Sequence, residues 1–414
     1  MEREMSAIPV ITVDLFLNPV LDRSADYGAA RGEILGQRAL AVARSDIQSW
    51  PGYAVTPLQE LTGIARQIGV ASVQYKDEGG RFGLGSFKAL GGAYAVARLL
   101  CRVIGERLGR SVTTQELLAG AHRDLAKDVT VTCATDGNHG RSVAWGAQLF
   151  GCRCVIYIHA TVSEGHRQAI EHYGAQVVRT AGNYDDAVRQ ADADAKALGR
   201  FVISDTSYEG YMDVPRDVMQ GYQLMVGEAV QQAGQMPTHV FIQGGVGGLA
   251  AAVCGYFWER LGGARPRVIV VEPERADCLM RSARSGKITA VHGDLDTLMA
   301  GLACGEVSLL AWNILEAGAD AFAVIADQAA IDTMRLLATP AAGDPAIVAG
   351  ESAVAGLAAA LGVAQNGQQC AALGIDANSR LMFFGSERDT DPALYQKLVG
   401  RSGAEVLAAA GGPA

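Results

Sequence analysis

Strands rich in β-branched residues alternate with helices along most of this chain, and several of the strands end in glycine-rich turns. The clearest pairs are a strand at 129–134 with a turn at 135–140, and a strand at 239–243 with a turn at 244–248. Repeated strand, turn and helix units predict right-handed βαβ crossovers in a parallel sheet. We therefore expect an α/β fold.

The hydrophobic pattern places the remaining elements. Strands are expected at 8–13, 73–75, 154–159, 176–180, 201–204, 268–272 and 380–384, and helices at 31–43, 59–67, 107–125, 163–173, 185–198, 214–232, 276–285, 330–338, 353–361 and 392–399. The segment 293–304 is interpreted as a loop with a short helix, and 404–414 as a frayed tail.

Composition narrows the class of protein. A chain of 414 residues with 49% hydrophobic residues, 50 glycines and 19% charged residues can form two domains with a substantial core. The net charge of −9 argues against nucleic acid or an anionic membrane as a partner. Eight scattered cysteines and seven histidines without ligand spacing predict neither a metal site nor a disulfide framework. Without a signal peptide or a long apolar run, we expect a cytoplasmic protein.

The segment 76–95, KDEGGRFGLGSFKALGGAYA, brings Lys88 from a glycine-rich turn into the start of an apolar helix. Burial and the positive helix N-terminus favour the neutral amine, which is the form that reacts with an aldehyde. The alternative is a surface lysine whose stem covers apolar neighbours.

The residues around Lys88 resemble a family. Ser86, Phe87 and Lys88, followed by Gly91-Gly92-Ala93, resemble the Schiff-base lysine motif of the fold-type II pyridoxal 5′-phosphate (PLP) enzymes. These are the tryptophan synthase β-like enzymes, which include the serine and threonine dehydratases. The segments 76–78 (KDE) and 81–84 (RFGL) are most similar to the diaminopropionate ammonia-lyases. Leu90 departs from the dehydratases, which usually carry arginine there.

The resemblance implies two parallel-sheet α/β domains with the cofactor in the cleft between them. The larger domain would comprise 1–90 and 182–414, and the smaller, inserted domain 91–181. The family also implies a homodimer.

A glycine-rich turn, formed by Gly244, Gly245, Val246, Gly247 and Gly248, lies between a strand and a helix. Backbone N–H groups and the helix N-terminus at such a turn can bind a phosphate group. By itself the turn could serve a nucleotide or no ligand, although it lacks the GxGxxG spacing. By resemblance, it binds the phosphate of PLP.

Two acidic residues are candidate bases. Asp136 begins the turn Asp-Gly-Asn-His-Gly, where the dehydratases usually carry serine, and its alternative role is an N-cap of the next helix. Asn138 inherits a bond to the cofactor's phenolate oxygen from the family. Asp205 matches the second acidic motif of the ammonia-lyases, although Ser207-Tyr208 replaces the usual Ala-Trp pair.

The resemblance also assigns roles near the C-terminus. Ser386 follows a strong strand and matches the family's threonine at the pyridine nitrogen. Earlier in the chain, the resemblance places Phe87 beside the cofactor. Ser86 and Glu351 are expected to bind substrate, together with the two aspartates. His139 is interpreted as a structural residue or as one that supports the residues in contact with the cofactor.

These residues together predict α,β-elimination of 2,3-diaminopropionate, of either hand, to pyruvate and two ammonia, with PLP as cofactor and Lys88, Asp136 and Asp205 as catalytic residues. One alternative is a PLP-dependent dehydratase or lyase of a hydroxy-amino acid such as serine, threonine or 3-hydroxyaspartate. Another is a non-catalytic protein that binds a phosphate or nucleotide through the glycine-rich turn.

Overall fold

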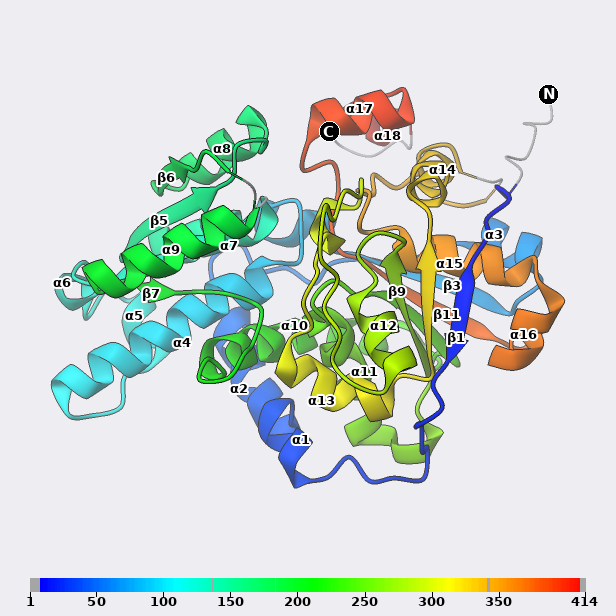
Figure 1. Ribbon diagram of the computed structural model, residues 1–414, viewed down its shortest axis with the longest axis horizontal. Helices are drawn as coiled ribbons and strands as arrows, with labels where there is room; N and C mark the ends of the chain where they lie inside the picture. The colour runs from blue at the N-terminus through cyan, green and yellow to red at the C-terminus, as the bar shows by residue number, and fades with distance from the viewer. Residues whose placement is uncertain (1–7, 136, 183, 341–342, 410–414) are drawn as a thin grey trace. The chain divides into compact units, whose positions relative to one another are not determined.

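The structure is a computed structural model that describes residues 8–135, 137–182, 184–340 and 343–409 (Figure 1). The chain forms two compact units. The first contains Met1–Gly36, Val55–Gly80 and Met225–Ala414, and the second contains Gln37–Ala54 and Arg81–Leu224. The domain boundaries expected from the sequence, 1–90 with 182–414 and 91–181, divide the chain at other residues and remain a prediction.

A seven-stranded sheet forms the centre of the first unit, in the order β1-β10-β9-β8-β11-β3-β2. The two edge strands are antiparallel to their neighbours, and the other pairs are parallel. The strands are β1 (Asp14–Leu17), β2 (Leu58–Glu60), β3 (Ser72–Asp77), β8 (His239–Gln243), β9 (Arg267–Pro273), β10 (Ala321–Ile325) and β11 (Arg380–Gly385).

Helices cover both faces of this sheet, as buried parallel strands require. On one face, Ile64, Met334 and Leu357 pack in a core with Phe241 and Phe383 from the strands. The helices on that face include α3 (Thr62–Ile68), α14 (Asp327–Ala338) and α15 (Ala355–Ala364), of which α15 is apolar all round and buried. The other helices of the unit are α1 (Ala29–Ile34), α11 (Gly248–Leu261), α12 (Cys278–Ser285), α13 (Leu309–Gly318), α16 (Gly367–Leu373), α17 (Pro392–Val399) and α18 (Gly403–Ala409).

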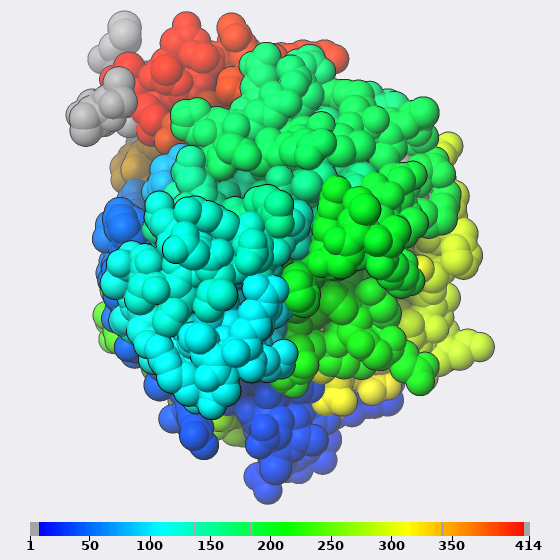
Figure 2. Space-filling view, turned by 90° about the vertical axis from the view of Figure 1, so that its left-hand side faces the viewer, coloured from blue at the N-terminus to red at the C-terminus, as the bar shows by residue number. Residues whose placement is uncertain are grey.

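The second unit contains a parallel four-stranded sheet in the order β6-β5-β4-β7. Its strands are β4 (Thr130–Ala134), β5 (Arg153–Ile158), β6 (Gln176–Arg179) and β7 (Phe201–Val202). Its helices are α2 (Gln37–Gln48), α4 (Ala89–Leu108), α5 (Thr114–Leu118), α6 (Arg123–Ala126), α7 (Asn138–Phe150), α8 (Glu164–Glu171) and α9 (Tyr184–Leu198), and α10 (Asp213–Gln232) begins here. Figure 2 shows the surface of this unit, with the segment from α4 to α6 in cyan and later residues in green.

Several expected elements differ from the structure. The first strand is Asp14–Leu17 and not 8–13, because it pairs with β10 through Asp14 and Val324. The helix expected at 31–43 is broken at Leu35 and Gly36, because α1 ends at Ile34 and α2 begins at Gln37. The helix expected at 107–125 is the end of α4 and two short helices, because Gly109 adopts a left-handed conformation and Thr113 begins a capping box with Glu116.

Four elements were not expected from the pattern, namely β2, α13, β10 and α16. The helix expected at 59–67 begins only at Thr62, because Leu58–Glu60 pairs with β3 as the strand β2. The segment expected as a frayed tail contains α18. None of the helices in the described part of the chain has the length and apolar character needed to cross a membrane.

Candidate active site

Lys88 and Asp205 form an ion pair in the second unit. Lys88 lies at the N-cap position of α4, and its Nζ is 2.7 Å from Asp205 Oδ2. The two side chains are only 19% and 23% exposed, so the pair is screened less than a surface pair. The sequence argument from burial favoured a neutral amine, but the carboxylate is a partner that stabilises the ammonium.

His139 is the third charged or polar group of this cluster. Its Nδ1 lies 4.0 Å from Asp205 Oδ2, and its Nε2 lies 2.8 Å from the carbonyl oxygen of Ile203. Burial acts to raise the pKa of Asp205, but Lys88 and then His139 outweigh burial, so this pKa lies well below its usual range. Asp205 is therefore a carboxylate at neutral pH.

Side chains on both sides of Asp205 fix the backbone that carries it. The hydroxyl of Tyr211 donates to the carbonyl of Val202 and accepts from the N–H of Ser204, while His139 holds the carbonyl of Ile203. The loop after β7 is thus tied to the end of its own strand and to α7. A fixed backbone holds the carboxylate in place for chemistry.

The glycines after Lys88 are explained by helix packing. A Cβ atom at Gly91 would lie 2.4 Å from Tyr222 Cε1 of α10, and one at Gly92 would lie 2.0 Å from Ser142 Oγ of α7. Phe87 packs on Tyr222 with the ring centroids 4.5 Å apart, and Ser86 is buried beside it. The small residues let α4 approach its neighbours closely and so place Lys88.

Asp136 lies outside the described residues, so nothing is added to its predicted role. The hydroxyl of Thr135 accepts the N–H groups of Gly137 and Gly140 and thereby caps the start of α7. Asn138 is the first residue of α7, next to His139 in the chain.

The glycine-rich turn follows β8 in the first unit. Gly245 and Gly247 have φ of 60° and 99°, which L side chains rarely adopt. Among the described residues, none accepts a hydrogen bond from the backbone N–H groups of Gly245, Val246 or Gly248. They precede the 14-residue helix α11, whose N-terminus adds partial positive charge. The turn therefore offers donors to an anion.

Ser386 lies at the end of the neighbouring strand, β11. Gln243 Nε2 donates hydrogen bonds to Ser386 Oγ and to the carbonyl of Phe384, and each donor–acceptor distance is 2.8 Å. The Ser386 oxygen is therefore already an acceptor, and its hydrogen is available to another acceptor. In the sheet, β8 lies between β9 and β11, where the connections turn to opposite sides. Ligands of open α/β sheets bind at such a point, beyond the carboxyl ends of the strands.

Glu351 lies near the same strand ends, in a loop held by Glu387. The N–H of Ser352 donates a hydrogen bond of 3.1 Å to Glu387 Oε1, and the N–H of Gly350 donates to the Glu387 carbonyl. Burial first, and then the charge of Glu387, raises the pKa of Glu351. A protonated Glu351 can donate a hydrogen bond.

The comparisons with known proteins agree with this arrangement. Residues 50–374 match the family described as pyridoxal-phosphate dependent enzymes. The chain belongs to this family. The diaminopropionate ammonia-lyase of Escherichia coli (strain K12) is 39% identical over 379 residues, which cover 90% of this chain and 94% of that protein. Its crystal structure in complex with an aminoacrylate-PLP azomethine reaction intermediate matches with a TM-score of 0.84 at 36% identity, covering 95% of this chain and 98% of that one. A probable D-serine dehydratase of Acidovorax ebreus is 28% identical over 221 residues, or 49% of this chain and 46% of that protein.

These matches confirm the fold-type II α/β fold and the PLP dependence expected from the sequence, and they exclude the non-catalytic alternative. The polar groups described above fit the chemistry of PLP, which has an aldehyde, a phosphate and a ring nitrogen. Lys88 supplies a primary amine, the glycine-rich turn supplies unpaired backbone donors, and Ser386 supplies a hydroxyl whose hydrogen is available. The buried Gln243 Oε1 has no partner among the described residues, a further sign of a polar site.

The predicted residues that the structure describes are divided between the two units. Ser86, Phe87, Lys88, Asn138 and Asp205 belong to the second unit, whereas the glycine-rich turn, Glu351 and Ser386 belong to the first. Gln243 and Glu387 were not predicted from the sequence, and His139 was predicted to be structural or to support the residues that contact the cofactor. Gln243 directly precedes the turn, and a polar residue closing an apolar strand was the available signal.

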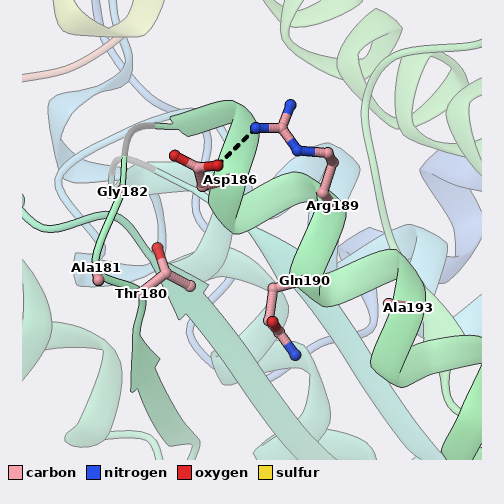
Figure 3. Close-up of a pocket in the computed structure, with 7 residues that line it drawn as sticks. All are labelled: Thr180, Ala181, Gly182, Asp186, Arg189, Gln190 and Ala193. Atoms are coloured by element: carbon pink, nitrogen blue, oxygen red, sulfur yellow. Dashed lines mark hydrogen bonds and ion pairs between the residues drawn. The ribbon is translucent and has the colours of Figure 1, made fainter.

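A separate open pocket of about 620 Å³ lies beside α9 (Figure 3). It is lined by Thr180, Ala181, Gly182, Asp186, Arg189, Gln190 and Ala193, and Arg189 is bonded to Asp186 over 2.6 Å. No predicted site residue lines it, so it is not the candidate active site of this PLP-dependent enzyme. The described residues also contain no group of three or more His, Cys, Asp or Glu side chains that could hold a metal ion.

Proposed function

We propose that this enzyme catalyses α,β-elimination of 2,3-diaminopropionate, giving pyruvate and two ammonia. The observation that carries the proposal is the Lys88–Asp205 ion pair, which joins an amine and a base in one cluster. The similarity to an ammonia-lyase extends over nine-tenths of the chain, whereas the similarity to a D-serine dehydratase covers half of it. This difference supports the diamine over a hydroxy-amino acid.

The proposed cofactor contacts use the groups described above. Lys88 would hold the cofactor aldehyde, the N–H groups of the glycine-rich turn its phosphate, and the Ser386 hydroxyl its ring nitrogen, with Asn138 and Phe87 beside the ring. When bound, PLP withdraws electrons and makes the Cα–H of an attached amino acid acidic.

Proton transfer falls to the residues of the chain. Asp205, a carboxylate at neutral pH, would accept the Cα proton of one enantiomer, and Asp136 that of the other. Lys88, or the second carboxylate, would keep the leaving β-amino group in its ammonium form. A protonated Glu351 would donate to the substrate carboxylate, and Ser86 would contribute to substrate binding.

The charge of the two proposed bases supports the substrate preference. A 2,3-diaminopropionate molecule carries a β-ammonium group, which carboxylates attract, whereas a β-hydroxyl is neutral. The dehydratases usually carry serine in place of Asp136, so their site has less of this attraction. Asp136 and Asp205 should therefore favour the diamine.

The test is a comparison of substrates. Pyruvate and ammonia release would be measured with D- and L-2,3-diaminopropionate, serine, threonine and 3-hydroxyaspartate. We expect the highest kcat/KM on the diamine, with two ammonia per pyruvate. Dominant turnover of serine with none of the diamine would instead assign the enzyme to the dehydratases.

We further propose that the protein is a cytoplasmic homodimer. The homodimer is proposed because it is the expected assembly of the family. Light scattering after gel filtration should give twice the 43.3 kDa chain mass. A mass equal to one chain would contradict the dimer.

A further inference from the structure

The imidazole of His139 connects the loop that carries Asp205 to α7, and one of its nitrogens has no hydrogen-bond partner in the described part of the chain. A carbonyl oxygen only accepts hydrogen bonds, so the 2.8 Å contact with Ile203 O places the hydrogen of the neutral ring on Nε2. Nδ1 then carries a lone pair. It is buried, lies 4.0 Å from Asp205 Oδ2 and has no hydrogen-bond partner among the described residues.

A buried polar atom without a partner is costly, so this one needs an explanation. Burial lowers the pKa of His139, and Lys88 adds to this effect while Asp205 opposes it. The ring is therefore neutral while the Lys88 ammonium balances the carboxylate. The lone pair of Nδ1 and the Asp205 carboxylate repel each other, and they attract only when a proton lies between them.

The other titratable groups that the structure describes around Asp205 do not supply that proton. The charge of Asp205 acts to raise the pKa of three such groups, which are Cys133 on β4, Tyr211 in the loop after β7 and Tyr222 on α10. Burial raises the pKa of all three, so they stay protonated and uncharged at neutral pH. Among the described residues, Lys88 and His139 are thus the groups that can exchange a proton with Asp205.

The geometry points to His139 as the proton acceptor behind Asp205, an inference that rests on the proposed function. Once Asp205 has taken the Cα proton, its O–H bond breaks and an N–H bond forms at Nδ1. The products are a carboxylate and an imidazolium whose Nε2–H stays on the Ile203 carbonyl. The proton then returns from Nδ1 to Asp205 Oδ2 and passes from there to the departing ammonia, so that both side chains end in their starting states. The contact shortens from 4.0 Å when the proton is shared, as catalytic hydrogen bonds do. His139 acts through Asp205 and is a positioning residue.

The first test needs neither cofactor nor turnover. The full-length protein without cofactor would be labelled with [15N]histidine, and the His139 signal assigned by its loss in His139→Gln. Lys88→Ala removes the ammonium that balances Asp205, so the pKa of His139 should rise by about one unit or more. Adding Asp205→Asn should abolish this rise. No rise, or an equal rise with Asp205→Asn, would overturn the inference. Lys88→Met fills more of the space of the lysine stem and serves if Lys88→Ala does not fold.

The second test separates the proton from the structural role. In His139→Gln, the amide can replace the Nε2 donor to Ile203 but has no titratable Nδ1. We expect kcat to fall about tenfold or more for the one enantiomer that Asp205→Asn also impairs, with an altered pH profile. The other enantiomer should stay within about twofold of the wild-type rate. Equal losses for both enantiomers would show a merely structural role.

Failure of the two proposals can be told apart. If the wild-type enzyme converts neither enantiomer of the diamine, the proposed function fails, and the histidine titration still decides whether Asp205 and His139 share a proton. His139→Asn is the matched control, because it keeps an amide near the Nδ1 position and loses the donor to Ile203. It should therefore reduce stability, whereas His139→Gln should not.

Discussion

Gln243 donates a 2.8 Å hydrogen bond to the hydroxyl oxygen of Ser386, and the two residues lie at the ends of neighbouring parallel strands. The same amide nitrogen donates to the Phe384 carbonyl, which fixes its orientation. The serine oxygen is thus an acceptor within the protein, and its hydrogen is left for a ligand. The buried Ser386 hydroxyl can therefore act as a neutral hydrogen-bond donor to a ligand.

Ser386→Ala should weaken PLP binding. The substitution removes the hydroxyl proposed to face the ring nitrogen and leaves the Gln243 amide with one acceptor. A lost hydrogen bond of about 1 kcal/mol corresponds to a rise of roughly fivefold to tenfold in the dissociation constant. Absorbance titration of the cofactor-free enzyme with PLP would measure it. Ser386→Thr keeps the hydroxyl and should bind PLP as the wild type does. Equal weakening by both changes would argue against the hydroxyl.

Asp136→Asn and Asp205→Asn should each impair one enantiomer. Each change removes a proposed base and retains the shape of the side chain, so kcat should fall about 10²-fold or more for one hand of the substrate. Pyruvate release from the separate D and L isomers measures this. Both variants should keep the absorbance of the bound cofactor, whereas Lys88→Ala should lose it. Loss of both hands in either single variant would contradict separate bases.

Gly91→Ala should destabilise the protein. The new Cβ would lie 2.4 Å from Tyr222 Cε1 and 2.7 Å from Val218 Cγ1, so the helices must move apart. Overpacking of this kind costs about 1–3 kcal/mol of unfolding free energy, measurable by urea denaturation. Gly32→Ala is the matched control, because Gly32 also lies in a helix and has nothing within 4 Å of an added Cβ. Its stability should be unchanged or slightly higher. Equal effects at both sites would rule out the steric explanation.

Much of the fold follows from local patterns, and the exceptions have physical reasons. The strand His239–Gln243 and its glycine-rich turn are evident because an apolar, β-branched run is followed at once by residues that allow positive φ. β10 was missed because Ala321–Ile325 follows the apolar helix α13 after only two residues, Ala319 and Asp320, so the pattern gives no clear boundary between a helix and a strand. β1 was misplaced because its position depends on pairing with β10.

The candidate site shows the same division. Lys88 and the glycine-rich turn carry local signals, and a family resemblance gave them roles. The approach of Asp205 to Lys88 joins residues 117 positions apart, and it depends on the loop after β7 being tied to α7. No spacing in the sequence reveals such a contact, or the burial of His139 Nδ1 without a partner among the described residues, because both follow from strand order.

The buried His239 should make stability depend on pH. Its Nε2 contacts the Leu373 carbonyl over 2.8 Å, and burial, the largest cause, lowers its pKa below the ordinary value of 6.5. The unfolded chain therefore binds this proton more readily, so the unfolding free energy falls as pH drops below 6.5, by at most about 1.4 kcal/mol per pH unit. His239→Gln can keep the donor to Leu373 and cannot titrate, so its stability should fall less between pH 6.5 and 5.5. Urea denaturation of both proteins at these pH values measures the difference. At pH 8, where His239 is neutral in both folded and unfolded chains, the offset between the two proteins should be constant, and parallel curves down to pH 5.5 would contradict the prediction.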